Sequence, residues 1–198
     1  DELTVTDKDG DEIKLTEKDD NKFTFKMPGS KVTVEASFKL IETEPENPFT
    51  DISKSDYFYD AVLWAADKGI TSGVTDTLFA PNVSCTRAQM VTFLWRVNGS
   101  PGIGTANPFS DVSSDAYYYD AVLWAVEQGI TGGTGDGKFS PDAPCTRAQM
   151  ATFLWRANGS PEVTGTTPFS DVSAGTYYYN AVLWAYERKI TNGTGGRK

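Results

Sequence analysis

Hydrophobic and polar positions follow two different patterns along this chain. In the first 41 residues, apolar side chains recur at every second position, as in the segments LTVT and KVTVEASF. From residue 57 onward, apolar side chains recur three and four positions apart, as in DAVLWAA. A period of two is typical of strands and a period near 3.6 is typical of helices. The pattern therefore predicts a short β segment followed by a longer helical part.

The β segment contains two turn signals. The stretch 3–16 alternates on both sides of Asp9-Gly10, which predicts a hairpin, and the stretch 22–38 predicts two more strands around a Pro-Gly turn. The letters DKDGDE are similar to the start of a calcium loop, but the later ligand positions of an EF-hand are absent, so a turn is favoured. We assign residues 1–41 to a small antiparallel β module, expected to be partial, and residues 42–47 to a charged linker.

The helical part repeats itself with a period of 60 residues. The motif PFTDIS begins at Pro48 and returns as PFSDVS at Pro108 and Pro168, while AVLWA occurs three times at the same spacing. Lys198 aligns with Lys138, so the third copy lacks a second helix, and we interpret the chain end as a truncation. The copies are assigned to residues 48–101, 102–161 and 162–198.

Each copy is predicted to consist of a helix, a loop and a second helix. In copy 1, Ser55 or Asp56 can cap a first helix over YFYDAVLWAADK, and Gly69 can close it. A loop then leads to a second helix that begins at Thr86 and stops at Asn98-Gly99. The first helix has a wide apolar arc that one copy cannot bury alone, so the copies are expected to pack on each other.

The second helix opens with the letters TRAQ in copies 1 and 2. Thr86 and Gln89 fit a capping box. Arg87 and Arg147 fall at the first helical position, where the helix dipole makes a cation mildly unfavourable. A helix N-terminus is, however, an anion site, and an arginine fork matches a carboxylate. The residues leave two interpretations open: the arginines bind an anionic ligand, or they pair with an acidic neighbour across the interface between copies.

Composition removes several classes of function. The chain has 198 residues, a formal net charge of −9 and no histidine. The acidic excess argues against a nucleic-acid partner, and the lack of histidine removes imidazole catalysis and histidine-ligated metals. No apolar run approaches the length of a membrane span. We therefore expect a chain that is not an enzyme, binds no metal or cofactor and does not insert into a membrane.

The order of motifs within a copy resembles the S-layer homology domain. Phe-x-Asp-Val, a helix with Tyr and Trp, Gly-Ile-Thr-x-Gly, Phe-x-Pro and Thr-Arg-Ala-Gln follow one another between Pro48 and Lys198. The family motif usually ends in Glu, where this chain has Gln89 and Gln149. The β segment more weakly resembles the small β-repeat modules of bacterial surface proteins.

This resemblance implies a fold and a function. S-layer homology domains typically come in threes, form a helical assembly with pseudo-threefold symmetry and anchor secreted proteins non-covalently to bacterial envelopes. The implied ligand is a pyruvylated secondary cell-wall polysaccharide, held in grooves between copies with its carboxylate on the motif arginine. We expect a mainly α, extracellular anchoring module at the bacterial cell surface. A structural surface-layer subunit that acts through self-assembly is the alternative.

The expected ligand-binding residues are the motif arginines, their glutamines, and the threonines and glycines of the Gly-Ile-Thr loops, where glycine lets the backbone approach a sugar. These residues are Arg87, Arg147, Gln89, Gln149, Gly73, Gly133, Thr71 and Thr131.

Other recurring side chains are expected to serve the fold. At least one aromatic residue of each Tyr-rich triplet at 57–59, 117–119 and 177–179 should be buried, while the rest are candidates for stacking on sugars. The tryptophans of the first helices are expected in the core, and the Asp of each Pro-Phe motif in a turn or cap. Equivalent positions around a pseudo-threefold axis are not generally close enough for a disulfide, so Cys85 and Cys145 are expected to be free, partly buried thiols.

Overall fold

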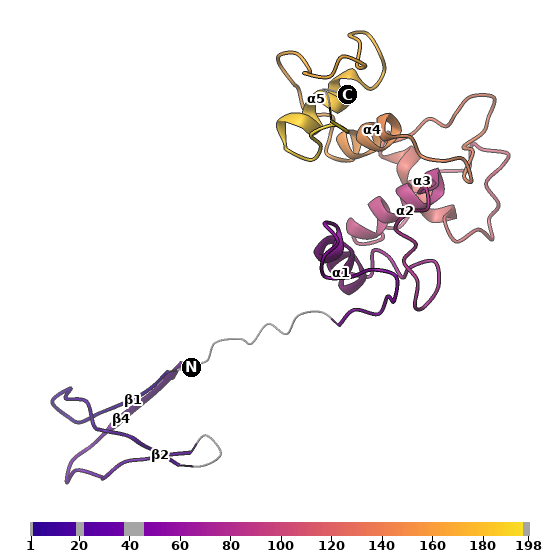
Figure 1. Cartoon of the computed structure of the whole chain (residues 1–198). Helices are drawn as coiled ribbons and strands as arrows, with labels where there is room; N and C mark the ends of the chain where they lie inside the picture. Colours follow the sequence, from indigo (N-terminus) through magenta and orange to yellow (C-terminus); the bar gives the residue numbers. More distant parts are fainter. Residues whose placement is uncertain (1, 19–21, 38–45, 196–198) are drawn as a thin grey trace. The chain divides into compact units, whose positions relative to one another are not determined.

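The computed structural model describes residues 2–18, 22–37 and 46–195 of the chain (Figure 1). It divides into two compact units, with the boundary between residues 44 and 45. Most of the predicted linker at 42–47 lies outside the described residues. Each unit is described by itself.

The first unit contains two small antiparallel sheets. β1 pairs with β4 along its full length, and β2 pairs with β3. Val5 on β1 is almost completely buried. The strands are β1 (Glu2–Thr6), β2 (Thr16–Lys18), β3 (Lys22–Thr24) and β4 (Thr33–Ser37).

The predicted hairpin at Asp9-Gly10 is present as a tight turn that continues into one bridge, between Thr6 and Glu12. The Asp7 carboxylate holds this turn by accepting hydrogen bonds from the N–H groups of Asp9 and Asp11. Beyond this bridge β1 takes β4 as its ladder partner and β3 takes β2, so the two strands on either side of the predicted Pro-Gly turn, β3 and β4, do not pair with each other. The choice of a distant partner is a tertiary effect that alternation along the sequence does not contain.

The second unit contains five described helices, two in each of the first two repeats and one in the third. The predicted helix–loop–helix order is confirmed in copies 1 and 2. The helices are α1 (Tyr59–Asp67), α2 (Arg87–Val97), α3 (Tyr119–Glu127), α4 (Arg147–Ala157) and α5 (Tyr179–Glu187).

The first helix of a repeat begins later than the sequence suggested. α1 starts at Tyr59 without a side-chain cap, because the Asp56 carboxylate accepts a hydrogen bond from the Ser53 N–H and closes the preceding turn. The predicted stop at Gly69 is confirmed: this residue has φ +66° and follows the C-cap, where a left-handed conformation favours glycine.

Consecutive repeats pack through the second helix of one and the first helix of the next. α2 packs against α3, α4 packs against α5, and α2 also contacts α4. The resulting core includes the fully buried side chains Val91, Val122, Ile130 and Phe139. α1 packs instead on the Phe49 and Ile52 side chains of its own repeat.

This arrangement gives the equivalent tryptophans different surroundings. Trp124 on α3 and Trp184 on α5 are 5% and 7% exposed, as expected for core residues. Trp64 on α1 is 51% exposed, so the prediction that it lies in the core was wrong. The faces of α3 and α5 are covered by α2 and α4, whereas α1 contacts no other helix among the described residues.

Candidate functional site: two grooves between repeats

Both Thr-Arg-Ala-Gln motifs form the predicted capping box. Thr86 Oγ1 accepts a hydrogen bond from the Gln89 N–H at 3.2 Å, and Gln89 Oε1 accepts one from the Thr86 N–H at 2.8 Å. Thr146 and Gln149 repeat the pair at 3.2 and 3.1 Å. The side-chain oxygen of each glutamine is therefore engaged at the start of its helix, and each arginine occupies the first helical position.

Arg87 is buried between repeats 1 and 2, in what we call groove 1. Its Nε donates a hydrogen bond of 2.9 Å to the Phe139 carbonyl oxygen, and its guanidinium carbon lies 4.8 and 5.3 Å from the ring centres of Phe139 and Phe153. The residue is 3% exposed, and its buried Nη2 atom has no hydrogen-bond partner among the described residues. Burial lowers the pKa of Arg87 from its usual value, and this outweighs smaller opposing effects of nearby acidic groups.

The Phe-x-Pro turn of repeat 2 closes groove 1 over the start of α2. The Ala88 N–H donates to the Pro141 carbonyl and the Arg87 N–H donates to the Ala143 carbonyl, both at 3.0 Å. The Phe139 side chain is fully buried beside them. The free N–H groups that make a helix N-terminus an anion site are therefore already satisfied at α2.

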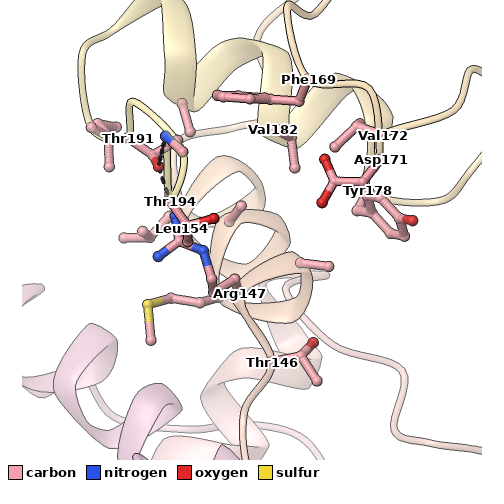
Figure 2. A pocket seen from close by; sticks show the side chains of 16 residues that line it. Thr146, Arg147, Leu154, Phe169, Asp171, Val172, Tyr178, Val182, Thr191 and Thr194 are labelled. Atoms are coloured by element: carbon pink, nitrogen blue, oxygen red, sulfur yellow. Dashed lines mark hydrogen bonds between the residues drawn. The ribbon is translucent and has the colours of Figure 1, made fainter. Parts of the chain in front are cut away.

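Groove 2, between repeats 2 and 3, is open. A cavity of about 500 Å³ lies between α4 and α5, and Arg147 is exposed at its edge (Figure 2). Arg147 Nη2 donates a hydrogen bond of 3.0 Å to Thr191 Oγ1, which also accepts the Gly193 N–H. Within residues 46–195, no group accepts a hydrogen bond from the backbone N–H of Arg147 or Ala148. This cavity thus combines an accessible guanidinium with two open N–H groups at a helix N-terminus.

The walls of groove 2 differ in chemistry. Arg147 and Thr191 lie on one side of the cavity in Figure 2, and Asp171 and Tyr178 lie on the other. Apolar side chains complete the lining, among them Leu154, Phe169, Val172 and Val182. A site with an apolar floor and a few polar groups at its rim suits a ligand that is partly apolar and carries an anionic group.

The Pro-Phe Asp residues brace each repeat. The Asp111 carboxylate accepts hydrogen bonds from the Phe139 and Ser140 N–H groups at 2.8 and 2.9 Å, and Asp51 does the same in repeat 1. Burial raises the pKa of Asp111, but these bonds together outweigh it, and the net pKa is lowered. The bond from Phe79 is the largest influence on Asp51, whose pKa is also lowered. The two bonds to Asp111 fix the position of the Phe-x-Pro turn that closes groove 1.

The predicted Thr and Gly residues of the loops bind within their own repeats. Thr71 Oγ1 accepts the Gly73 N–H, and Thr131 Oγ1 accepts the Gly133 N–H, each at 3.1 Å. Both glycines have positive φ, and a Cβ on Gly73 would lie 2.6 Å from the Phe49 ring. The glycines are thus required by the close packing of each loop against its own repeat.

The structure joins Arg147 of repeat 2 to the equivalent loop of repeat 3, through Thr191. Thr191 and Gly193 were missing from the predicted set, and Asp171 was expected only in a turn or cap, whereas Tyr178 belongs to a triplet named as a candidate for stacking on sugars. The 60-residue period contained the signal, since Thr191 and Gly193 are the third-copy counterparts of the Thr and Gly chosen in copies 1 and 2.

The prediction of ion pairs for the arginines finds no counterpart. Among the described residues, neither Arg87 nor Arg147 forms an ion pair with a carboxylate. The expectation of a buried aromatic residue in each triplet is confirmed for Tyr59 in the first triplet and was wrong for the other two, where Tyr118, Tyr119, Tyr178 and Tyr179 are only partly buried. Tyr57 and Tyr117 are exposed and lie edge-on to the next aromatic residue. Tyr177 repeats this arrangement.

Two further features of the described residues bear on function. They contain no cluster of three or more side chains suited to hold a metal ion. None of their helices has the length and apolar character needed to cross a membrane.

Repeats that pack on one another through equivalent helices, with an open cavity between repeats 2 and 3, define a repeated helical module. The profile of the S-layer homology domain matches residues 48–91, 108–151 and 168–198, and the chain belongs to this family. The resemblance found in the sequence is thereby confirmed, including the shortened third copy. The S-layer homology domain is a non-catalytic anchoring module, and membership places the chain at the bacterial cell surface.

Relatives include large proteins of several kinds. An endoglucanase of a Bacillus species is 30% identical over 152 residues, which are 74% of this chain and 16% of the enzyme. The surface-layer 125 kDa protein of Lysinibacillus sphaericus is 30% identical over 63% of the chain and 11% of its own length. The cellulosome-anchoring protein of Acetivibrio thermocellus is 31% identical over 42% of the chain and 20% of its own length. The chain thus spans a fifth or less of each of these relatives.

Proposed function

We propose that this chain anchors a larger protein to the cell wall by binding an anionic, pyruvylated secondary cell-wall polysaccharide in the grooves between its repeats. The observation that carries the proposal is Arg147 in groove 2. Its guanidinium is exposed beside a cavity of about 500 Å³, and its side chain is held by a neutral hydroxyl, Thr191, instead of a carboxylate. A charge-assisted bond to a ligand carboxylate is the interaction that this arrangement leaves available.

The pyruvyl group suits both parts of groove 2. Its carboxylate can accept bonds from the Arg147 fork and from the open N–H groups at the start of α4. Its methyl group matches apolar lining such as Leu154 and Val182. Gln149, whose oxygen completes the capping box, keeps the helix start in the geometry that the carboxylate requires.

Groove 1 is proposed as a second, narrower site. Its available donor is the unpartnered Nη2 of the buried Arg87, so a ligand must reach past the Phe139 turn to contact it. Arg147 of repeat 2 contacts Thr191 in the loop of the following repeat. By equivalence, the loop residues Thr131 and Gly133 of repeat 2 belong to groove 1, with Arg87 of repeat 1. Thr71 and Gly73 would belong to a groove formed where another second helix covers α1, and the Gln89 cap would position Arg87.

We further infer that the repeats follow a pseudo-threefold arrangement. Support comes from the recurrence of one contact: α2 on α3 and α4 on α5, with α2 touching α4. A third contact of the same kind would place a helix with the α2 sequence pattern on the face of α1 that carries Ala61 and Trp64. Both of these side chains are exposed, whereas the counterparts of Ala61 in α3 and α5 are fully buried.

The same α1 face supports the alternative function. A structural surface-layer subunit would use the exposed Trp64 and its neighbours to bind another chain of the same surface layer. The relative named as a surface-layer protein fits this alternative, although its name describes that protein alone.

Sedimentation with purified cell walls separates the two functions. Walls are tested before and after chemical removal of the secondary polysaccharide, with the wild-type chain and with Arg147→Ala. The anchor proposal expects co-sedimentation that is lost both on stripping and on substitution. Binding that survives stripping, together with concentration-dependent self-association, would favour the surface-layer subunit.

A further inference from the structure

Cys85 and Cys145 face each other where repeats 1 and 2 meet. Thr86 and Pro144 are partners in an antiparallel bridge. In such a pairing, the residue before one partner lies opposite the residue after the other. Cys85 therefore lies opposite Cys145, and the Cys145 N–H donates a hydrogen bond of 2.8 Å to the Cys85 carbonyl oxygen.

This register fits the geometry of a disulfide. Facing residues of an antiparallel pair have Cα atoms about 4.5–5.5 Å apart and side chains on the same side of the pair. Disulfides span Cα separations of roughly 4.4–6.8 Å. Cys85 and Cys145 both pack against the same core cluster, as expected for side chains on one side. The expectation that equivalent positions are too far apart was wrong, because the segments that lead into α2 and α4 run antiparallel to each other at this point.

Both thiols are free and partly buried, as predicted from the sequence. Cys85 Sγ lies 3.4 Å from the Thr86 carbonyl oxygen and Cys145 Sγ lies 3.9 Å from that of Thr146. Thiols are weak donors, so little is lost when these contacts are given up. The chain has two cysteines in all, so no third thiol competes within the molecule.

We propose that Cys85 and Cys145 form a redox-responsive pair whose oxidation cross-links repeats 1 and 2. One thiolate attacks a small-molecule disulfide, forms a mixed disulfide and releases one small thiol. The second thiolate then attacks the sulfur of the first cysteine, which forms the protein disulfide and releases the second small thiol. The cysteine pair loses two protons and two electrons, and the electrons reduce the external disulfide. A cell-surface location supplies such oxidising conditions.

The cross-link would act on groove 1 and leave groove 2 unchanged. It joins positions 60 residues apart and fixes the segment that carries Phe139 and Pro141 over the start of α2. Arg87 would then be held in its buried position, while Arg147 stays open to its cavity. This proposal rests on the positions of the two cysteines and does not depend on the proposed glycan binding.

The test measures how strongly the native fold favours the disulfide. Burial raises the pKa of both thiols, to about 11 for Cys145, so direct exchange in the folded chain is slow. Reduced, unfolded chain is therefore refolded at low protein concentration in glutathione buffers of graded redox ratio. The linked peptide containing both cysteines is quantified by mass spectrometry, and the same equilibration is run in concentrated urea. We expect the effective concentration of the pair to be roughly a hundredfold to a thousandfold higher in the folded chain.

The matched control moves one thiol to the other side of the segment. In the variant Cys85→Ser/Ser84→Cys, the loop length changes by one residue, but successive side chains of an extended segment point in opposite directions. This variant should show nearly the same effective concentration with and without urea. A wild-type ratio near or below one, or a ratio matched by the control, would overturn the proposal. A wild-type ratio far above the control would establish it.

Discussion

The Nε atom of Arg87 donates a hydrogen bond to the carbonyl oxygen of Phe139, which lies 52 residues further along the chain. The same guanidinium lies over the Phe139 ring. This contact ties the second helix of repeat 1 to the Phe-x-Pro turn of repeat 2. At the equivalent place in groove 2, Arg147 contacts Thr191 and borders a cavity. One motif thus supplies a buried arginine that joins two repeats and an exposed arginine beside an open groove.

The two arginines should differ in their effect on stability. Arg87→Ala removes a buried bond to a carbonyl and two ring contacts, so we expect the free energy of unfolding to fall by about 1–3 kcal/mol. Arg147→Ala, at an exposed position of the same motif, serves as the matched control and should change it by less than about 0.5 kcal/mol. Urea unfolding followed by circular dichroism measures both. Equal losses in the two variants would contradict the structural role of Arg87.

Acid should weaken the brace between Asp111 and the Phe-x-Pro turn. The pKa of Asp111 is lowered in the folded chain. The contribution of this carboxylate to the free energy of unfolding is therefore fully present above about pH 4 and is lost as the pH falls through the folded pKa. Asp111→Asn should therefore lower the free energy of unfolding by about 1–2 kcal/mol at pH 7, with the difference from wild type shrinking below pH 4. Asp171→Asn is the control, because no described N–H group donates to that carboxylate. A difference for Asp111→Asn that stays constant with pH would argue against this brace.

Cys145 should be slow to alkylate in the folded chain. Burial raises its pKa from 9.0 to about 11, so at pH 8 the reactive thiolate is about a hundredfold rarer than in the unfolded chain. Iodoacetamide labelling with and without urea, read at the peptide containing Cys145, gives the ratio of rates. Similar rates in both conditions would show that the thiol is not buried as described.

Covering the exposed face of α1 should stabilise the second unit. A chain extended after Lys198 by a copy of residues 139–161 supplies a further Phe-x-Pro turn and a further second helix. We expect the melting temperature to rise by about 5–10 °C as apolar surface is buried. In oxidative footprinting, the rate at which Trp64 is oxidised should fall towards that of Trp124.

The control for the extended chain carries the same residues with the helical part in scrambled order. It adds the same length and composition without the capping box or the apolar face. An extended chain no more stable than this control would mean that the repeats do not close on one another.

Local features of the fold were predictable because their causes lie within a few residues. Thr86 and Gln89 form their capping box from atoms three residues apart, and Gly69 ends α1 through its own backbone conformation. The repeat period likewise revealed the family, since several motifs recur in fixed order. The start of α1 was missed because Asp56 uses its carboxylate on the preceding turn, at Ser53.

Features that depend on distant residues were not predictable from pattern. The burial of Arg87 depends on Phe139 in the next repeat, and the partner of Arg147 comes from the third repeat. β1 likewise takes its partner from the far end of the first unit. Periodicity shows which residues are equivalent, but it does not show which copy supplies the neighbour.

The proposed anchoring function depends on Arg147 binding an anionic sugar. The most direct measurement is a set of calorimetric isotherms with wall polysaccharide fragments, with and without pyruvyl groups, for wild type, Arg147→Ala and Arg147→Lys. We expect that removing the pyruvyl group or the guanidinium weakens binding by about tenfold to a hundredfold. Lysine should recover only part of this loss, because an ammonium lacks the bidentate fork. For fragments that already lack pyruvyl groups, Arg147→Ala should weaken binding little further, since both changes remove the same contact. Equal affinity of wild type and Arg147→Ala for pyruvylated fragments, with both variants folded, would contradict the proposed function.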